Sequence, residues 1–154
     1  MSDTLKVCGL TIERGTKLRT YLPVPDTNVK IPLTIINGDQ DGPTLLITAG
    51  IHGGEYPGIA AAMELGRDIE PEHVAGFLIR MHPVNIQVFW ARREMIVPED
   101  GKNLNRVFPG DPMGTLADKT AYLISNNFFP IADFYVDMHS GDIHESLDPY
   151  VYYP

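Results

Sequence analysis

The stretch Thr44-Leu45-Leu46-Ile47-Thr48-Ala49 decides how this chain folds. Its nearly continuous apolar run is typical of a strand buried on both faces, and such strands belong to sheets that are covered by helices. The next regular segment, residues 57–68, has Pro57 at an early position and small or apolar residues at helical spacing, namely Ile59, Ala62, Met63 and Gly66. We therefore expect a buried strand that leads through a short loop into a helix.

Strand and helix patterns alternate on both sides of this unit. Residues 16–24 and 29–37 predict antiparallel strands with turn residues between them, and residues 39–43 predict a loop. The elements predicted downstream are a strand over 76–81, a helix over 118–128, and strands over 134–138 and 150–153. This alternation predicts a three-layer α/β domain. No stretch has the composition of a linker, so we expect residues 1–154 to form a single domain.

Composition excludes several classes of protein. The 154 residues include 12 Lys or Arg and 20 Asp or Glu, and the net charge of −8 argues against a nucleic-acid or anionic membrane surface. Cys8 is the only cysteine, which excludes an intrachain disulfide and a cysteine-rich zinc site. The sequence has neither a basic leader nor an apolar run of spanning length. We expect a cytoplasmic protein with a small-molecule partner, and a homo-oligomer is an open alternative.

A candidate metal site follows the buried strand. His52 and Glu55 lie in the loop at its carboxyl end, which is where α/β sheets bind ligands. Between them, Gly53 and Gly54 would leave room for an ion and allow unusual backbone angles. A catalytic zinc ion takes three protein ligands, and two His with one Glu is a known set. The alternative is a glycine-rich turn in which the histidine caps the helix and the glutamate complements its dipole.

The third ligand of such a set would be His139. This residue follows the predicted strand over 134–138, so it should reach the same edge of the sheet as His52. Asp137 lies two residues earlier, on the same side of an extended strand, where its carboxylate could orient a ligand histidine. The alternative for Asp137 is a helix cap or a surface position at the end of the strand.

A polar segment in the middle of the chain is a candidate for substrate binding. Asn105 and Arg106 bring an amide and a guanidinium together, and arginine binds a carboxylate through two parallel hydrogen bonds. Read alone, the segment also fits an ordinary solvated loop. Arg93 is a further candidate, although Arg92 and Arg93 together are equally typical of a solvated face.

Three motifs together resemble the succinylglutamate desuccinylase/aspartoacylase family, which is related to the zinc carboxypeptidases. They are His52-Gly53-Gly54-Glu55, Asn103-Leu104-Asn105-Arg106-Val107-Phe108-Pro109-Gly110 and Asp137-Met138-His139-Ser140-Gly141. The resemblance implies a carboxypeptidase-like α/β fold, one zinc ion on His52, Glu55 and His139, and hydrolysis of an amide that links an acyl group to an amino acid. Asn105 and Arg106 match the substrate-binding pair, and Arg106 could also stabilise the oxyanion. Aspartoacylase-type members have Asp in place of Asn103, and Arg93 is the nearest match to their second substrate arginine.

Two other functions stay open at this point. One is a zinc carboxypeptidase that acts on peptides, and the other is a zinc- and carboxylate-binding domain without turnover. In the family the general base is a glutamate well downstream of the third zinc ligand. Only fifteen residues follow His139, and Glu145, the sole glutamate among them, does not match that motif. We therefore expect this chain to be the amino-terminal portion of a longer enzyme.

Overall fold

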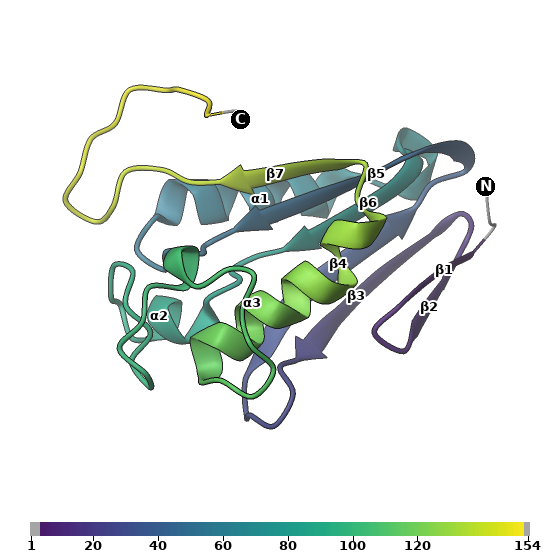
Figure 1. Cartoon of the computed structure of the whole chain (residues 1–154). Helices are drawn as coiled ribbons and strands as arrows, with labels where there is room; N and C mark the ends of the chain where they lie inside the picture. The colour runs from purple at the N-terminus through teal and green to yellow at the C-terminus, as the bar shows by residue number, and fades with distance from the viewer. Residues whose placement is uncertain (1–3, 153–154) are drawn as a thin grey trace.

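The central feature of the fold is a five-stranded mixed sheet, seen in a computed structural model that describes residues 4–152 (Figure 1). Its strand order is β3-β4-β6-β5-β7, and β1 and β2 form a separate hairpin. The strands are β1 (Thr4–Val7), β2 (Leu10–Glu13), β3 (Thr16–Pro23), β4 (Lys30–Asn37), β5 (Gln40–Ala49), β6 (Ala75–Met81) and β7 (Phe134–Met138). The helices are α1 (Tyr56–Asp68), α2 (Ile86–Trp90) and α3 (Leu116–Asn127), with short 3-10 turns η1 (Pro71–His73), η2 (Leu104–Arg106) and η3 (Phe129–Ile131).

The predicted central strand is β5, which lies between two parallel neighbours. Leu46 pairs with Ile79 of β6 on one side and with Tyr135 of β7 on the other. β4 pairs antiparallel with β6, and β3 pairs antiparallel with β4. Ala49 is in register with Met138 at the ends of β5 and β7. The loops that follow these two strands therefore leave the sheet side by side.

Helices cover both faces of the sheet, which confirms the predicted α/β architecture. In Figure 1, α3 crosses one face and α1 lies behind the other. The larger apolar core joins α3 and the β1–β2 hairpin to the sheet through residues that include Ile12, Leu33, Leu46, Ile79 and Ile124. The smaller core under α1 contains Ile36, Ile47 and Leu78. Burial of these aliphatic side chains is the main favourable contribution to folding, at about 1.5–3 kcal/mol for each fully buried large residue.

Helix α1 packs closely on the sheet because small residues face it. Ile59, Ala62 and Gly66 are buried as predicted, but Met63 is 53% exposed. Arg80 of β6 donates a hydrogen bond from Nη1 to the backbone oxygen of Ala62 at 2.7 Å. A Cβ atom on Gly66 would overlap the Arg80 guanidinium, so a larger residue there would force this buried group to move. The helix is thereby held with its amino-terminal end at the loop after β5.

Three local expectations differ from the structure. Residues 150–152 form no strand, and Tyr153 lies outside the described residues. Residues 40–43 belong to β5, where the pairing with β6 shifts register between Gln40 and Thr44, and do not form the expected loop. The β1–β2 hairpin was not predicted; it turns through Cys8 and Gly9, both with positive φ. No helix within residues 4–152 is long and apolar enough to cross a membrane.

Candidate metal centre

The site begins where β5 ends. Gly50 has φ of +71°, and a Cβ atom there would meet Pro83 and Ile59 within 3 Å, so the chain turns away from the sheet through a glycine. His52 follows, and Glu55 occupies the N-cap position of α1. Nδ1 of His52 lies 2.7 Å from Oε1 of Glu55. Both side chains are largely buried, with exposed fractions of 12% and 9%.

His139 reaches the same carboxylate from β7. Its Nδ1 lies 2.8 Å from Oε2 of Glu55, and the backbone N–H of Ser140 donates to the same oxygen at 3.1 Å. The His52 and His139 rings meet edge to face with centroids 5.1 Å apart. Each oxygen of Glu55 therefore faces Nδ1 of a different histidine. The structure brings together all three residues that the sequence singled out as metal ligands.

This cluster fits a zinc ion by its chemistry and spacing. The candidate donor atoms of His52, Glu55 and His139 all lie within 4.8 Å of one another. Two imidazoles and one carboxylate are a ligand set of catalytic zinc sites, which leave a further coordination position open. The group of three could hold a metal ion.

The contacts also set the protonation of the cluster. Burial raises the pKa of Glu55, but hydrogen bonds from His139 and His52 outweigh it and lower the pKa to about 2. Hydrogen bonds to Asp137 and Glu55 raise the pKa of His139 to about 10, against the effect of burial. Glu55 is therefore ionised at neutral pH, as a metal ligand would have to be. His139 carries a proton that a metal ion would have to displace.

Asp137 lies behind His139. Its Oδ2 is 2.8 Å from Nε2 of His139, and its Oδ1 accepts a hydrogen bond from Oγ1 of Thr48 at 2.6 Å. The Tyr135 hydroxyl lies 2.8 Å from the same Thr48 oxygen. Asp137 is thus placed to orient the His139 ring with Nδ1 toward Glu55. Neither Thr48 nor Tyr135 was predicted from the sequence as part of the site, although Thr48 lies in the strand of residues 44–49.

Asn103 lies behind His52 in a corresponding position. Oδ1 of Asn103 is 3.2 Å from Nε2 of His52 and accepts a hydrogen bond from the backbone N–H of Asn105 at 2.9 Å. Sequence reasoning left the role of Asn103 open. Its contact joins residues 51 positions apart, and no local pattern predicts such a contact.

Asn105 and Arg106 lie in the turn η2, which Asn103 caps. Asn105 is half-buried, whereas Arg106 is exposed. Nη1 of Arg106 contacts the backbone oxygen of Asn105 at 3.3 Å. Among the contacts of the described residues, the Arg106 guanidinium touches none of the three cluster residues. The structure thus places the predicted pair next to the cluster through Asn103 and leaves the guanidinium exposed to solvent.

Arg93 lines a cavity of about 550 Å³ beside the cluster. The remaining lining residues are Arg92, Glu94, Met95, Ile96, Ile143 and His144. The backbone N–H of Gly54 donates to the oxygen of Glu94 at 3.0 Å, so the cavity adjoins the loop of His52 and Glu55. Within residues 4–152, Arg92, Arg93 and Arg106 form no ion pair, although most other cations of this acidic chain do. Arg92 and Arg93 thus line a cavity that adjoins the loop of His52 and Glu55.

One of the two roles expected for Gly53 and Gly54, the supply of unusual backbone angles, was wrong. Neither Gly53 nor Gly54 has a positive φ. A Cβ atom on Gly53 would lie 2.5 Å from the backbone nitrogen of Phe89, and one on Gly54 would overlap Asp142. These glycines permit close approach of neighbouring segments. They do not supply unusual backbone angles.

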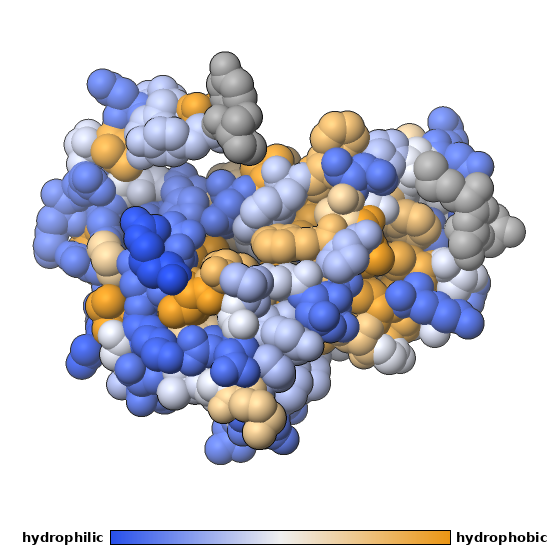
Figure 2. Space-filling model, viewed as in Figure 1, coloured by the Kyte–Doolittle hydropathy of each residue, from blue (hydrophilic) through white to orange (hydrophobic). Residues whose placement is uncertain are grey.

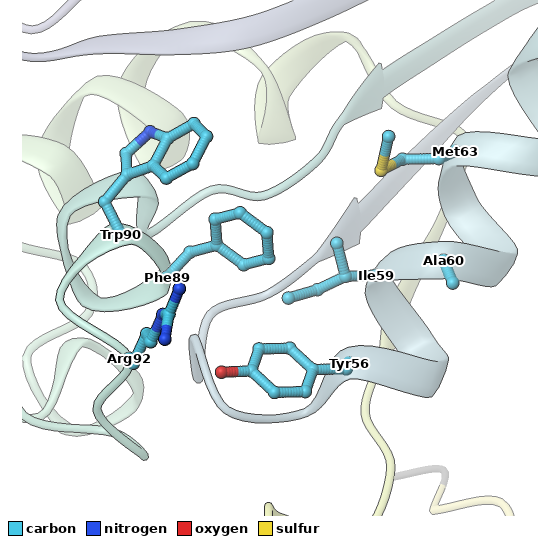
Figure 3. Close-up of a pocket in the computed structure, with 7 residues that line it drawn as sticks. All are labelled: Tyr56, Ile59, Ala60, Met63, Phe89, Trp90 and Arg92. Atoms are coloured by element: carbon cyan, nitrogen blue, oxygen red, sulfur yellow. The ribbon is translucent and has the colours of Figure 1, made fainter.

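A second hollow is separate from the cluster. It has a volume of about 500 Å³ and lies between α1 and α2, where Figure 3 shows the side chains of Tyr56, Ile59, Ala60, Met63, Phe89, Trp90 and Arg92. None of His52, Glu55 and His139 lines it. The hydropathy surface of Figure 2 shows hydrophilic residues gathered on the left of the view, where the arrow of β7 points in Figure 1. The metal cluster thus belongs to the polar edge of the molecule.

Comparison with known proteins identifies the family. Residues 41–154 match the succinylglutamate desuccinylase/aspartoacylase catalytic domain. The chain belongs to this family. A curated relative, N-alpha-acetyl-L-2,4-diaminobutyric acid deacetylase of Halomonas elongata, is 41% identical over 128 residues, which cover 79% of this chain and 37% of that protein.

Two solved structures show the same fold. The product-bound ectoine utilization protein EutE (DoeB) from Ruegeria pomeroyi has a TM-score of 0.77 at 38% identity. The succinylglutamate desuccinylase/aspartoacylase from Rhodobacter sphaeroides has a TM-score of 0.75 at 36% identity. Each comparison covers 84% of this chain and 41% of the other chain. The chain thus spans about two fifths of the length of these relatives.

Proposed function

We propose that this chain carries the zinc-binding part of an amidohydrolase that removes the acyl group from an N-acylated amino acid. The observation that supports this most strongly is the geometry of Glu55, whose two oxygens face Nδ1 of His52 and Nδ1 of His139 at 2.7 and 2.8 Å. Bound zinc supplies Lewis-acid polarisation of the scissile carbonyl and activation of water. His52, Glu55 and His139 would hold it.

The arginines near the cluster favour a carboxylated substrate. Arg93 lines the adjoining cavity, and Arg106 is exposed at the end of η2. In a chain of net charge −8, unpaired guanidiniums give a local positive region that can bind a carboxylate bidentately. We assign Arg93 and Asn105 to substrate binding, and Arg106 to substrate binding and stabilisation of the developing oxyanion.

The family and a curated relative support an N-acyl amino acid as the substrate class. The Halomonas relative is named for deacetylation of N-alpha-acetyl-L-2,4-diaminobutyric acid. That compound has an amide next to a carboxylate, which suits a metal site flanked by arginines. We therefore take N-acetyl-2,4-diaminobutyrate as the first substrate to test, followed by N-acetylaspartate and N-succinylglutamate.

None of the three carboxylates Glu55, Asp137 and Glu145 is free to act as the general base. Glu55 and Asp137 both face histidines, and Glu145 lies in an exposed turn where Oε2 accepts from the backbone N–H of Asp142 at 3.4 Å. A base is still needed to take the proton of the attacking water. Whether this chain alone can turn over a substrate is therefore a question for an assay.

The test is acyl release by the 154-residue chain, with and without added zinc. A matched variant, His52→Ala, removes one ligand, and a dipeptide serves as the competing substrate class. Since no described carboxylate is assigned as the base, we expect the 154-residue chain to bind zinc and the N-acyl amino acid, and zinc-dependent hydrolysis to occur in a longer reading frame, assayed alongside, that supplies a base. His52→Ala should abolish both. Preference for the dipeptide would favour the carboxypeptidase alternative. Binding of zinc and of N-acyl amino acids without hydrolysis, in the longer reading frame as well, would favour a binding domain without turnover.

A further inference from the structure

The side chain of Asn103 makes contacts with both of its polar ends. Oδ1 faces Nε2 of His52 at 3.2 Å and accepts from the backbone N–H of Asn105 at 2.9 Å. Nδ2 lies 3.3 Å from Sδ of Met95. The backbone donor requires an oxygen at the Oδ1 position, so the same oxygen faces the His52 ring.

We propose that Asn103 is a positioning residue that holds His52 with Nδ1 toward the metal and couples metal binding to the turn that carries Arg106. This inference rests on the proposed metal site. One oxygen serves both purposes, because it contacts the His52 ring and caps η2. A shift of the His52 ring on metal binding would therefore move the backbone of Asn105 and Arg106 through the Asn103 side chain.

The two ligand histidines differ in what holds them. His139 contacts the carboxylate of Asp137 at 2.8 Å, whereas His52 contacts a neutral amide oxygen at 3.2 Å. A carboxylate makes a shorter and stronger hydrogen bond with a ring N–H and increases the basicity of the imidazole more than an amide does. Asn103 therefore orients His52 but leaves it the weaker of the two nitrogen ligands. Replacement of this amide by a carboxylate should strengthen metal binding.

Zinc affinity, measured by competition with a chelator, tests the positioning role. We compare the unaltered chain with Asn103→Ala, which removes the oxygen, and Asn103→Asp, which keeps it and adds charge. We expect about 10–100-fold weaker zinc binding for Asn103→Ala, the usual effect of losing such a partner, and tighter binding than the unaltered chain for Asn103→Asp. Equal affinity of the alanine variant and the unaltered chain would overturn the proposal. So would an aspartate variant as weak as the alanine variant.

Two further measurements separate positioning from a general loss of structure. In the zinc-loaded chain, the Nε2–H proton of His52 should exchange with water faster in Asn103→Ala, and that of His139 should not change. Zinc should shift the backbone amide signals of Asn105 and Arg106 in the unaltered chain and much less in the variant. If Asn103→Ala fails to fold, the zinc affinity of Asn103→Asp relative to the unaltered chain still tests the positioning role. None of these measurements needs turnover, so failure of the proposed deacylase activity leaves a distinct result.

Discussion

Neighbouring strands β5, β6 and β7 each lead into a histidine, but only two of the three belong to the metal cluster. His52 and His139, after β5 and β7, share the carboxylate of Glu55. His82 directly follows β6 and is half-buried, and its Nδ1 has no hydrogen-bond partner within residues 4–152. Burial, together with the charge of Arg80, lowers the pKa of His82 to about 4, whereas Asp137 and Glu55 raise that of His139 to about 10.

The difference lies in the partners of each histidine and not in its place at a strand end. Asp137 precedes His139 by two residues and Glu55 follows His52 by three, so each cluster histidine has a carboxylate close in sequence. No acidic residue stands within five positions of His82. Both ring nitrogens of each cluster histidine face an oxygen, from Glu55 and Asn103 for His52 and from Glu55 and Asp137 for His139, and this distinguishes them from His82.

The largest expected effect is loss of zinc binding on substitution of either cluster histidine, compared with substitution of His82. We predict that His52→Ala and His139→Ala each abolish stoichiometric zinc binding, because two remaining ligands hold the ion poorly. The matched variant His82→Gln should keep one zinc ion per chain. Metal analysis after dialysis against buffer measures all three. Retention of zinc by either alanine variant would contradict the assignment of that ligand.

The second prediction concerns stability at low pH. His82 has a folded-state pKa of about 4, below its ordinary value near 6.5, so the unfolded chain binds an extra proton between these values. Stability from neutral His82 is thus fully present above about pH 6.5 and is lost as pH falls toward 4. We expect the chain to lose up to about 3 kcal/mol more than His82→Gln between pH 7 and pH 4.

Urea unfolding of the metal-free proteins at several pH values measures this difference. The other titrating groups are common to both proteins, so their contributions cancel in the comparison. Parallel pH profiles for the two proteins would show that His82 titrates normally, and would remove the contrast with His139.

The third prediction concerns substitutions of Asp137, one of which, Asp137→Asn, gives His139 an amide partner like that of His52. Asp137→Ala should weaken zinc binding by about 10–100-fold, because Nε2 of His139 loses its acceptor. Asp137→Asn keeps an oxygen without charge and should cost less than the alanine change. Chelator competition gives the order. An asparagine variant as weak as the alanine variant would mean that the charge of Asp137, and not its orienting contact, is what matters.

The smallest expected effect on zinc affinity is at Thr48, which contacts Asp137 and not a histidine of the cluster. Thr48→Val removes the hydroxyl that donates to Oδ1 of Asp137 at 2.6 Å and changes the shape of the side chain little. We expect about 2–10-fold weaker zinc binding, the net value of one hydrogen bond. Thr34→Val, at another buried threonine of the sheet, is the matched control and should leave zinc affinity unchanged. Equal loss in both variants would indicate a general effect on the sheet.

Much of the fold was predictable because it depends on local patterns. The apolar run of residues 44–49 identified β5, and helical spacing after Pro57 identified α1. Strand ends on a common edge then brought His52 and His139 together before any contact was known. Residues 150–152 show the limit, because a short apolar run forms a strand only where a neighbouring strand pairs with it.

The parts of the site that were missed depend on contacts between distant segments. Asn103 meets His52 only after the intervening 50 residues have folded, and Thr48 meets Asp137 only when β5 and β7 pair. The glycines of the loop were misread for the same reason. Gly53 is needed because the backbone of α2 approaches it, and the helix over Ile86–Trp90 was not predicted.

We expect His52, Glu55 and His139 to hold one zinc ion through Nδ1 of both imidazoles. A crystal structure of the zinc-loaded chain, with anomalous scattering at the zinc edge, tests it most directly. We predict one strong peak at about 2.0–2.2 Å from both Nδ1 atoms and a Glu55 oxygen, with Nε2 of each ring still facing Asn103 or Asp137. A peak elsewhere, or one bound through Nε2 of either histidine, would contradict the account.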